Sequence, residues 1–378
     1  MIRTIYLENF KCFHHKQAIK LGSTLTLMYG KNGRGKSSIA QSLLILGQTM
    51  RATNSLETLY IMGDLAKQGT FDEIITHPSD KNEIKISLET EDEKLEIGFS
   101  SYPGKSQLAR LTTFIINGQN RLETKTSNNE QNPTNNNSDF SLISKSIGTT
   151  SDINILQKLK EISVVTAGRL GPVNSILRND SLRPDWLGVN GENLINVLAN
   201  KGPEFIAKVE HYLSIILSGA AIRIPNPEAD TIELKLNSTD GSVYFRPINV
   251  GFGYSYVLPV IVATLLAENG SILILENPEA HLHPGAQSRL TKFIIQIAKE
   301  KNLQVIIETH SDHVINGMRI AIKQELLHPS DGMIIHLAHE KEYADPTITF
   351  ITCDKNGTLS SYPDDFMDEW TQQMFDLV

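Results

Sequence analysis

The stretch that decides the fold is Gly30-Lys31-Asn32-Gly33-Arg34-Gly35-Lys36-Ser37-Ser38. It matches G-x-x-x-x-G-K-[ST], the pattern of a phosphate-binding loop, with Gly30, Gly35, Lys36 and Ser37 at the fixed positions. The apolar run Leu25–Tyr29 before it predicts a buried strand, and Ile39–Leu46 after it predicts a helix. A strand, a glycine loop and a helix form the context that phosphate binding needs. The stretch therefore predicts a nucleoside triphosphate site.

Each part of the loop has its own expected contact. The glycines allow successive backbone N–H groups to face an anion, and the helix N-terminus adds the positive end of its dipole. Lys36 is expected to contact the β- and γ-phosphates, and the Ser37 hydroxyl is expected to ligate Mg²⁺. The rest of the loop is expected to surround the phosphates; it consists of Gly30, Lys31, Asn32, Gly33, Arg34, Gly35 and Ser38.

Composition describes an acidic globular protein. The chain has 378 residues, of which 40% are hydrophobic and 21% charged, and its formal net charge is -8. This bulk charge gives no support for nucleic-acid binding, although a local basic face is compatible with it. The two cysteines, Cys12 and Cys353, form no metal-type spacing and no disulfide framework. Met1–Phe13 does not resemble a signal peptide, and the run Val257–Ala267 is too short to span a membrane, so a cytoplasmic location without a membrane is expected.

The remaining pattern predicts an antiparallel region followed by a parallel one. Two N-terminal strands are expected to join the strand before the phosphate loop, and the later alternating segments are expected to form antiparallel strands at 83–88, 94–99, 108–117 and 121–124. The Asn-rich segment Thr126–Ser138 cannot bury enough apolar surface to fold and is expected to be a flexible loop. Residues 192–217 predict a helix in two pieces that divide near Gly202-Pro203. From Asn249 onward, strands alternate with helices, which is typical of a parallel sheet.

Two apolar strands carry polar residues directly after them. Ser271–Leu275 leads into Glu276, and Gln304–Ile307 leads into Glu308-Thr309-His310. An acid at the carboxyl end of a strand beside a phosphate loop can hold the water shell of Mg²⁺, which is the role predicted for Glu276. A histidine in the equivalent place can bond the γ-phosphate or the attacking water, as predicted for His310.

Other interpretations of these residues stay open. A transition-metal site is one, because four histidines (His281, His283, His310 and His313) accompany Glu276, Glu279 and Glu308. A second is that the histidines are solvated loop residues, which suits His281 or His313 better than His310. Lys11 lies on a turn ahead of the phosphate loop, where it either reaches the γ-phosphate or a nucleobase or belongs to ordinary sheet packing.

The phosphate loop, the segment Glu276–Pro284 and the segment Glu308–Ser311 together resemble the ABC-type ATPases of the SMC, RecF and OLD group. More narrowly, the chain is similar to bacterial AAA-type predicted ATPases that have a C-terminal domain of unknown function. The leading motif, the signature segment and the tail carry this narrower likeness; they are Leu7–Phe13, Asn249–Pro259 and Cys353–Trp370. Residues 100–160 match only loosely.

This resemblance implies an α/β fold of the ABC or SMC-head type, with a mixed central sheet, an antiparallel β lobe, a short inserted helical subdomain and no long coiled coil. The chain is expected to be a single bilobed head over 1–378. Its predicted parts are an N-terminal lobe with the phosphate loop (1–125), a flexible Asn-rich loop (126–139), an inserted helical and β region (140–248), a C-terminal lobe (249–352) and a tail (353–378).

The resemblance also implies ATP and Mg²⁺ as cofactors and a head-to-tail homodimer, or a higher oligomer, with ATP between the subunits. The signature segment of one subunit, with Gly251, Gly253 and Ser255, would face the phosphate loop of the other. Glu276 would be the strand-end acid, His310 the switch histidine, and Gln68 the glutamine that senses Mg²⁺.

Two departures from the pattern of these ATPases affect the expected rate. The usual order after the apolar strand is Asp then a catalytic Glu, whereas this chain has Glu276 then Asn277. An amide orients water but accepts no proton, so hydrolysis is expected to be slow unless Glu279 or His310 substitutes. Gly251 also stands where ABC transporters carry Ser, although the backbone N–H groups of a helix start still suit a phosphate.

The function expected from this resemblance is a nucleotide-dependent dimer that regulates a separate effector, a nuclease or toxin, in anti-phage defence or repair. The chain itself shows no nuclease pattern, and whether it touches DNA directly is left open. A non-hydrolysing scaffold held together by ATP is the main alternative, favoured by Asn277. A transporter's nucleotide-binding subunit is a weaker one, because the usual transporter signature is missing.

Overall fold

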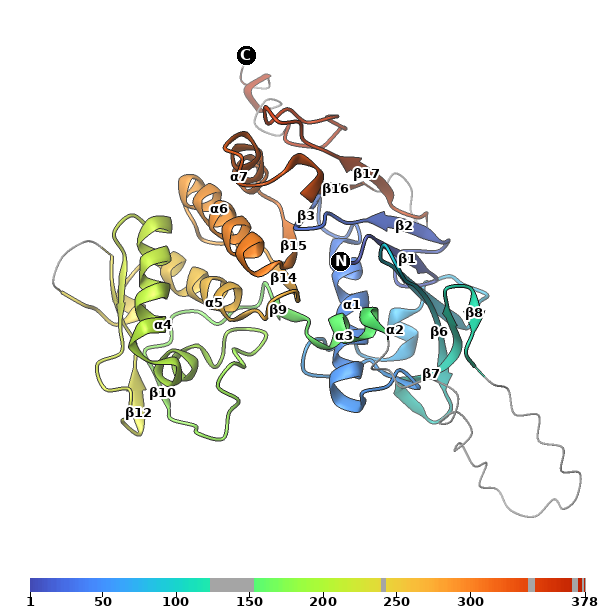
Figure 1. Ribbon diagram of the computed structural model, residues 1–378, viewed down its shortest axis with the longest axis horizontal. Coiled ribbons are helices and arrows are strands. Elements are labelled where there is room, and N and C mark those ends of the chain that lie inside the picture. Colours follow the sequence, from blue (N-terminus) through green and yellow to red (C-terminus); the bar gives the residue numbers. More distant parts are fainter. Residues whose placement is uncertain (123–152, 239–242, 339–343, 369–372, 376, 378) are drawn as a thin grey trace, which may run out of the picture. The chain divides into compact units, whose positions relative to one another are not determined.

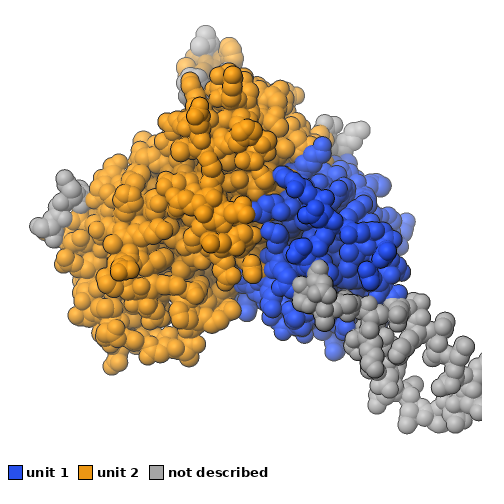
Figure 2. All heavy atoms as spheres, in the orientation of Figure 1, with its two compact units in different colours: residues 1–20, 41–160, 341–345 blue, residues 21–40, 161–340, 346–378 orange. Residues whose placement is uncertain are grey.

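The computed structural model describes residues 1–122, 153–238, 243–338, 344–368, 373–375 and 377, which form two compact units (Figures 1 and 2). Unit 1 contains residues 1–20, 41–160 and 341–345, and unit 2 contains residues 21–40, 161–340 and 346–378. The phosphate loop therefore belongs to the same unit as the segments Glu276–Pro284 and Glu308–Ser311. The predicted domain boundaries stay predictions, and the Asn-rich loop lies outside the described residues.

Unit 1 is built on an antiparallel sheet, as the alternating segments predict. Its strand order is β2-β1-β5-β6-β7-β4, with β8 paired to β7. The strands are β1 (Thr4–Glu8), β2 (Gln17–Lys20), β4 (Thr58–Tyr60), β5 (Glu83–Glu89), β6 (Lys94–Tyr102), β7 (Lys105–Ile116) and β8 (Gln119–Asn120). Two short helices accompany them, α2 (Phe71–Ile74) and α3 (Asn154–Lys160).

Two predictions about these strands are wrong. β1 pairs with β2 and β5, not with the strand before the phosphate loop, which belongs to the sheet of unit 2. Periodicity identifies a strand by its local pattern but contains no information about its partner, which explains the error. The predicted start of the last strand at 121 is wrong: the short strand after β7 lies at Gln119–Asn120, because the turn at Asn117-Gly118 returns the chain immediately onto β7, and residues 121–122 belong to no strand. Residues 123–124 lie outside the described part of the chain.

Unit 2 is built on a mixed sheet of order β17-β16-β3-β15-β14-β9. Its strands are β3 (Leu25–Tyr29), β9 (Ser163–Val165), β14 (Ile272–Glu276), β15 (Gln304–Thr309), β16 (Gly332–Ala338) and β17 (Thr347–Ile351). All neighbouring pairs are parallel except β16 with β17. The parallel arrangement brings the carboxyl ends of β9, β14, β15 and β3 to one edge of the sheet.

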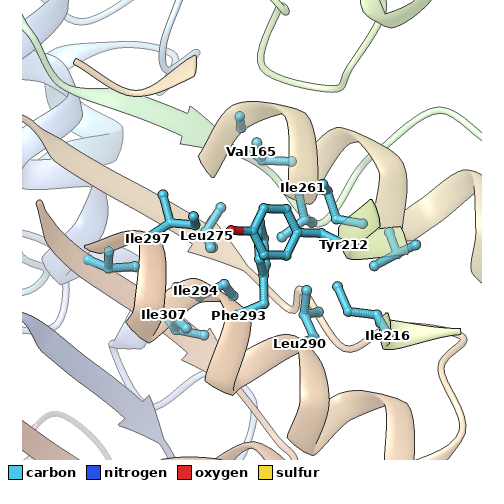
Figure 3. Close-up of a cluster of buried hydrophobic side chains, with 14 of the residues drawn as sticks. Val165, Tyr212, Ile216, Ile261, Leu275, Leu290, Phe293, Ile294, Ile297 and Ile307 are labelled. Atoms are coloured by element: carbon cyan, nitrogen blue, oxygen red, sulfur yellow. The ribbon is translucent and has the colours of Figure 1, made fainter. Parts of the chain in front are cut away.

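Helices cover this sheet because their apolar faces need burial. They are α4 (Leu194–Ile216), α5 (Phe252–Leu266), α6 (Pro284–Lys301) and α7 (Asp312–Lys323), while α1 (Lys36–Thr53) starts at the phosphate loop. α4 is divided as predicted, because Gly202 has a non-helical φ of 78° just before Pro203. Figure 3 shows side chains of these helices, among them Tyr212, Ile261 and Phe293, gathered near Leu275 and Ile307 of the sheet. The rings of Tyr212 and Phe293 lie 4.5 Å apart.

The inserted region adds two small ribbons to unit 2. β10 (Ser175–Leu177) pairs with β12 (Thr231–Glu233), and β11 (Ala221–Arg223) pairs with β13 (Lys235–Asn237), both antiparallel. The predicted hairpin turn at 239–241 lies outside the described residues. The longest helix of the described part, α4, has 23 residues and is kinked, so this part holds no long coiled coil. No described helix is long and apolar enough to cross a membrane.

Candidate nucleotide site

The phosphate loop joins β3 to α1 through backbone conformations that require glycine. Gly30, Gly33 and Gly35 have φ values of 142°, 74° and 96°. A side chain at Gly30 would in addition place its Cβ 2.4 Å from the carbonyl oxygen of Leu337. Only glycine adopts these backbone conformations without strain. They give the loop the backbone geometry that anion binding needs.

Lys36 turns its ammonium group back over the loop. Its Nζ donates to the carbonyl oxygens of Gly30 at 2.7 Å and Lys31 at 2.9 Å, and the residue is only 3% exposed. Burial lowers the pKa of Lys36, while the nearby Glu308 carboxylate raises it. A cation held in this way is available to phosphate oxygens that approach the loop.

Glu308 is the carboxylate that contacts Ser37. The Ser37 hydroxyl donates to Glu308 Oε1 at 2.9 Å, and the carboxylate is 8% exposed. Burial raises the pKa of Glu308, and the Ser37 hydrogen bond opposes this. β15 lies directly beside β3, with Glu308 in register with Met28, so this acid stands one strand away from the phosphate loop.

Glu276 stands one strand further from the loop than the motif suggested. It is the parallel register partner of Glu308 on β14, and β15 separates β14 from β3. Its Oε2 accepts a hydrogen bond from the amide of Ala167 at 3.0 Å. The expectation that Glu276 is the acid next to the loop needs correction, because neighbouring strands lie about 4.8 Å apart and the nearer place belongs to Glu308. Its predicted role toward Mg²⁺ stays a prediction.

Asn277 follows β14 in a left-handed conformation, with φ of 43°. Its main-chain N–H donates to the main-chain carbonyl oxygen of Glu308 at 2.8 Å, and its main-chain carbonyl accepts from the N–H of Ala280 at 3.1 Å. The side-chain Oδ1 is buried and has no hydrogen-bond partner. Buried polar atoms are normally paired, so this unpaired Oδ1 marks a position with a role other than packing.

Glu279 and His310 follow the ends of β14 and β15 and contact each other there. Glu279 Oε1 accepts from the Thr309 hydroxyl at 2.6 Å and from the His310 amide at 3.2 Å, whereas its buried Oε2 has no partner. Burial raises the pKa of Glu279. Burial, followed by the charge of Lys36, lowers the pKa of His310 and favours its neutral ring. A backbone hydrogen bond with Gly30 opposes that shift, so the ring lies beside the phosphate loop.

The signature segment forms the start of α5, with Gly251 as the residue before the helix. Phe252 is 57% exposed there, but Ser255 is only 7% exposed and its hydroxyl has no partner. Ser255 is thus buried within its own subunit, and its predicted place facing another subunit's phosphate loop stays a prediction. Gly253 is required for packing, because a Cβ there would lie 2.8 Å from the carbonyl oxygen of His281.

Lys11 and Gln68 come together in unit 1. The Lys11 ammonium donates to the side-chain oxygens of Gln68 and Gln41, and burial lowers the pKa of Lys11. Gln41 lies one turn after Ser37 in α1 and was not singled out by the sequence, in which a lone glutamine on a helix gives no signal. The predicted contacts of Lys11 with nucleotide and of Gln68 with Mg²⁺ stay predictions.

The tail packs beside the phosphate loop within unit 2. Phe366 is buried against the rings of Tyr29, at 5.1 Å, and His336, at 5.6 Å. Asp365 forms an exposed ion pair of 2.7 Å with Lys31. The tail therefore stabilises the strand that leads into the loop and holds the side chain of Lys31 outside it.

The transition-metal interpretation finds no support in this arrangement. Among the residues that the structure describes, no three His, Cys, Asp or Glu side chains are placed so that they could hold a metal ion. His281 instead packs against Tyr256, with the ring centroids 4.4 Å apart and the rings tilted by 52°, and His283 caps the start of α6.

Comparison with known families decides the class of this site. A family model described as "AAA domain, putative AbiEii toxin, Type IV TA system" matches residues 25–316, more than half of the chain. The chain belongs to this family. The match contains the phosphate loop, the signature segment and both strand-end motifs of this AAA domain. It ends before the tail, whose likeness to a domain of unknown function stays a prediction. No curated protein sequence matches the chain.

Solved structures agree with this AAA domain assignment at the level of the fold. An SMC head bound to the C-winged helix domain of ScpA has a TM-score of 0.56 and 16% identity, covering 94% of this chain and 98% of that one. An SMC head with an extended coiled coil, bound to the C-terminal domain of ScpA derived from Pyrococcus furiosus, has a TM-score of 0.50 and 14% identity, covering 100% and 99%. The chain therefore contains an AAA domain of this family and has a fold like that of SMC heads, as predicted.

Proposed function

We propose that this protein binds ATP with Mg²⁺, hydrolyses it slowly, and uses an ATP-bound head-to-tail homodimer to regulate a separate effector in DNA-related work such as anti-phage defence or repair. The observation that carries the nucleotide part is the loop Gly30–Ser37, with a buried lysine at its centre and a serine hydroxyl facing a carboxylate. The family and the SMC-head-like fold support the ATPase class.

The residues present fit Mg²⁺ and a triphosphate. Mg²⁺ prefers oxygen ligands and keeps several waters, and the Ser37 hydroxyl with the Glu308 carboxylate supplies such oxygens. When bound, the metal would neutralise charge on the β- and γ-phosphates. Lys36 would donate to phosphate oxygens in place of the loop carbonyls that it contacts here. Glu276, the register partner of Glu308, would complete an acidic rim for the metal's water shell.

The chain offers two groups for handling the attacking water. His310, kept neutral by its surroundings, can accept a hydrogen bond from water or donate one to the γ-phosphate. Glu279 can accept a proton through its unpartnered Oε2, and its raised pKa makes it a better base than an ordinary carboxylate. Asn277 would orient water without taking its proton, and this is the reason to expect slow turnover.

The dimer part rests on the start of α5. The exposed helix start with Gly251 and Phe252 suits contact with a second copy, since free N–H groups at a helix N-terminus favour a phosphate bound to the partner. The similar SMC heads are each bound to another protein in their crystals, which supports a separate protein partner here. A scaffold that holds ATP without hydrolysing it is the second candidate, and Asn277 favours it because its side-chain amide accepts no proton.

Phosphate release and dimerisation together test the proposal. With ATP and Mg²⁺, we expect light scattering to show a shift from monomer to dimer, and a sensitive phosphate assay to show slow release. A dimer without released phosphate would support the scaffold instead. If neither dimer nor phosphate release appears, although ATP binds, the proposed function fails.

Substitution of the two acids decides which one supports the metal. We expect Glu308→Gln to raise the Mg²⁺ concentration needed for half-maximal turnover by about tenfold or more, since it removes a buried charge beside Ser37 and leaves the size unchanged. Glu276→Gln, one strand further away, is the matched control and should have a smaller effect. A larger effect of Glu276→Gln in the same Mg²⁺ titration would return the metal role to Glu276.

A further inference from the structure

A buried arginine lies at the same sheet edge, in the loop that follows β9. Arg169 is 3% exposed and belongs to neither strand-end motif. Its Nη1 donates to the carbonyl oxygens of Thr166 at 2.9 Å and Glu276 at 2.7 Å, and its Nη2 donates to that of Asn277 at 2.6 Å. The guanidinium therefore binds the main chain at the end of β14.

The burial of this cation needs an explanation beyond packing. A buried charge is costly unless other groups compensate for it, and the carbonyls of Glu276 and Asn277 supply only partial charges. Burial lowers the pKa of Arg169, and the carboxylate of Glu279, the largest opposing influence, raises it. Its Nε is buried and has no partner. Replacement by an apolar residue would avoid this cost, so the position is occupied for a specific purpose.

We infer that Arg169 is a positioning residue that holds the main chain of Glu276 and Asn277 and connects it to the signature helix α5. Its hydrogen bonds fix the two carbonyls on either side of the left-handed turn at Asn277. This turn sets the direction in which the Asn277 side chain leaves the strand end. The turn continues into Glu279, whose carboxylate holds the amide of His310.

The connection to the signature helix runs through aromatic rings. The Arg169 guanidinium lies over the ring of Tyr256, with Cζ 5.9 Å from its centroid. Tyr256 belongs to α5 and its ring packs against that of His281, which follows the same turn five residues after Glu276. Gly253, one turn earlier on α5, packs against the carbonyl of His281. A displacement at the start of α5 would thus reach Asn277 by packed groups within one subunit.

This inference deepens the proposed function, because it assigns a route by which a partner bound at the signature segment would influence the residues around Asn277. The positioning role itself does not depend on hydrolysis. It predicts that the main chain at the end of β14 is less well ordered without the guanidinium, whether or not ATP is turned over.

Hydrogen exchange of the full-length protein without nucleotide tests the positioning role. We expect Arg169→Lys, which keeps the charge but loses the planar fork, to accelerate exchange of the amides of Asn277, Ala280 and Leu282 by about tenfold or more. Arg289→Lys is the matched control, because Arg289 also donates to a main-chain carbonyl, that of Ile216, away from this edge. Its effect should be confined to its own surroundings.

A lower kcat with an unchanged Kd for ATP is a result that a general loosening of the protein structure would not produce. If the protein hydrolyses ATP, Arg169→Lys should lower kcat by about tenfold or more and leave the Kd for ATP within about threefold, since the phosphate loop is untouched. A wild type without turnover would refute the hydrolysis in the proposed function, and exchange would still test Arg169. Unchanged exchange at the three amides, or equal acceleration by Arg289→Lys, would overturn the inference.

Tyr256 provides a second test if Arg169→Lys does not fold. Tyr256→Phe keeps the ring below the guanidinium and is expected to leave exchange at Asn277 and Ala280 as in the wild type. Tyr256→Leu removes the ring and is expected to accelerate the same amides by roughly threefold or more, in line with the loss of one cation–π contact. Equal exchange in the two variants would overturn the connection to α5.

Discussion

Lys36→Ala is expected to weaken ATP binding by at least about a hundredfold. Charge-assisted hydrogen bonds contribute about 1.5–3 kcal/mol each, and a tenfold change in Kd corresponds to about 1.4 kcal/mol, so the loss of two such bonds to phosphate accounts for this factor. The ammonium of Lys36 is already confined to the loop by two carbonyls, so little side-chain freedom is lost when phosphate arrives. Equilibrium binding of ATP, measured by calorimetry, checks this expectation.

Lys31→Ala is the control within the same loop. Lys31 is exposed and its ammonium forms an ion pair with Asp365, so its removal should change ATP affinity by no more than a few fold. The nucleotide-dependent dimer should disappear in Lys36→Ala and persist in Lys31→Ala. If Lys36→Ala retained the wild-type affinity, the site assignment as a whole would be refuted.

Asn277→Glu is expected to increase the rate of ATP hydrolysis by roughly a hundredfold, because general-base assistance is worth about 10²–10⁴-fold and an amide provides none. The substitution places a carboxylate directly after β14, at the residue whose side-chain Oδ1 has no hydrogen-bond partner. The left-handed backbone at φ 43° favours Asn, so the variant should also lose about 1 kcal/mol of stability. Phosphate release under single-turnover conditions measures the effect on the chemical step.

Asn277→Gln separates basicity from size in this experiment. It has the length of Glu and the same backbone cost, but its amide accepts no proton, so its rate should stay at or below that of the wild type. Equal acceleration by both variants would show that space, not a base, limits the reaction. No acceleration by either would mean that Glu279 or His310 already serves as the base.

Local sequence was sufficient for much of this site. The strand before the glycine loop is found at the predicted residues, and the helix after the loop contains the predicted residues 39–46 but extends over Lys36–Thr53. Their signals lie within a short run of consecutive positions. The division of α4 near Gly202 was predictable for the same reason, because Gly and Pro act on their own backbone. Glu276, Asn277 and His310 stand at strand ends, as the apolar runs before them indicate.

Glu308 shows where local signals became ambiguous. Glu308 visibly ends an apolar strand in the sequence. Glu276 ends another one, and the role of the acid beside the phosphate loop was predicted for Glu276. The choice between them depends on whether β14 or β15 is the neighbour of β3, and both orders fit the same periodicity. The burial of an acid that contacts Ser37 distinguishes the two, and only the folded chain shows it.

Arg169 and Ser255 had no local signal for their places at all. The cation of Arg169 reaches Glu276 and Asn277 across more than one hundred residues. Ser255 is buried by the packing of α5, although it lies in the signature segment that is expected to face another subunit. The sequence by itself determined the glycine loop, the strand before it and the polar residues that follow β14 and β15. The tertiary structure alone decided which acid meets Ser37 and which cation holds Asn277, because strand order and helix packing arise from contacts between distant segments that periodicity does not encode.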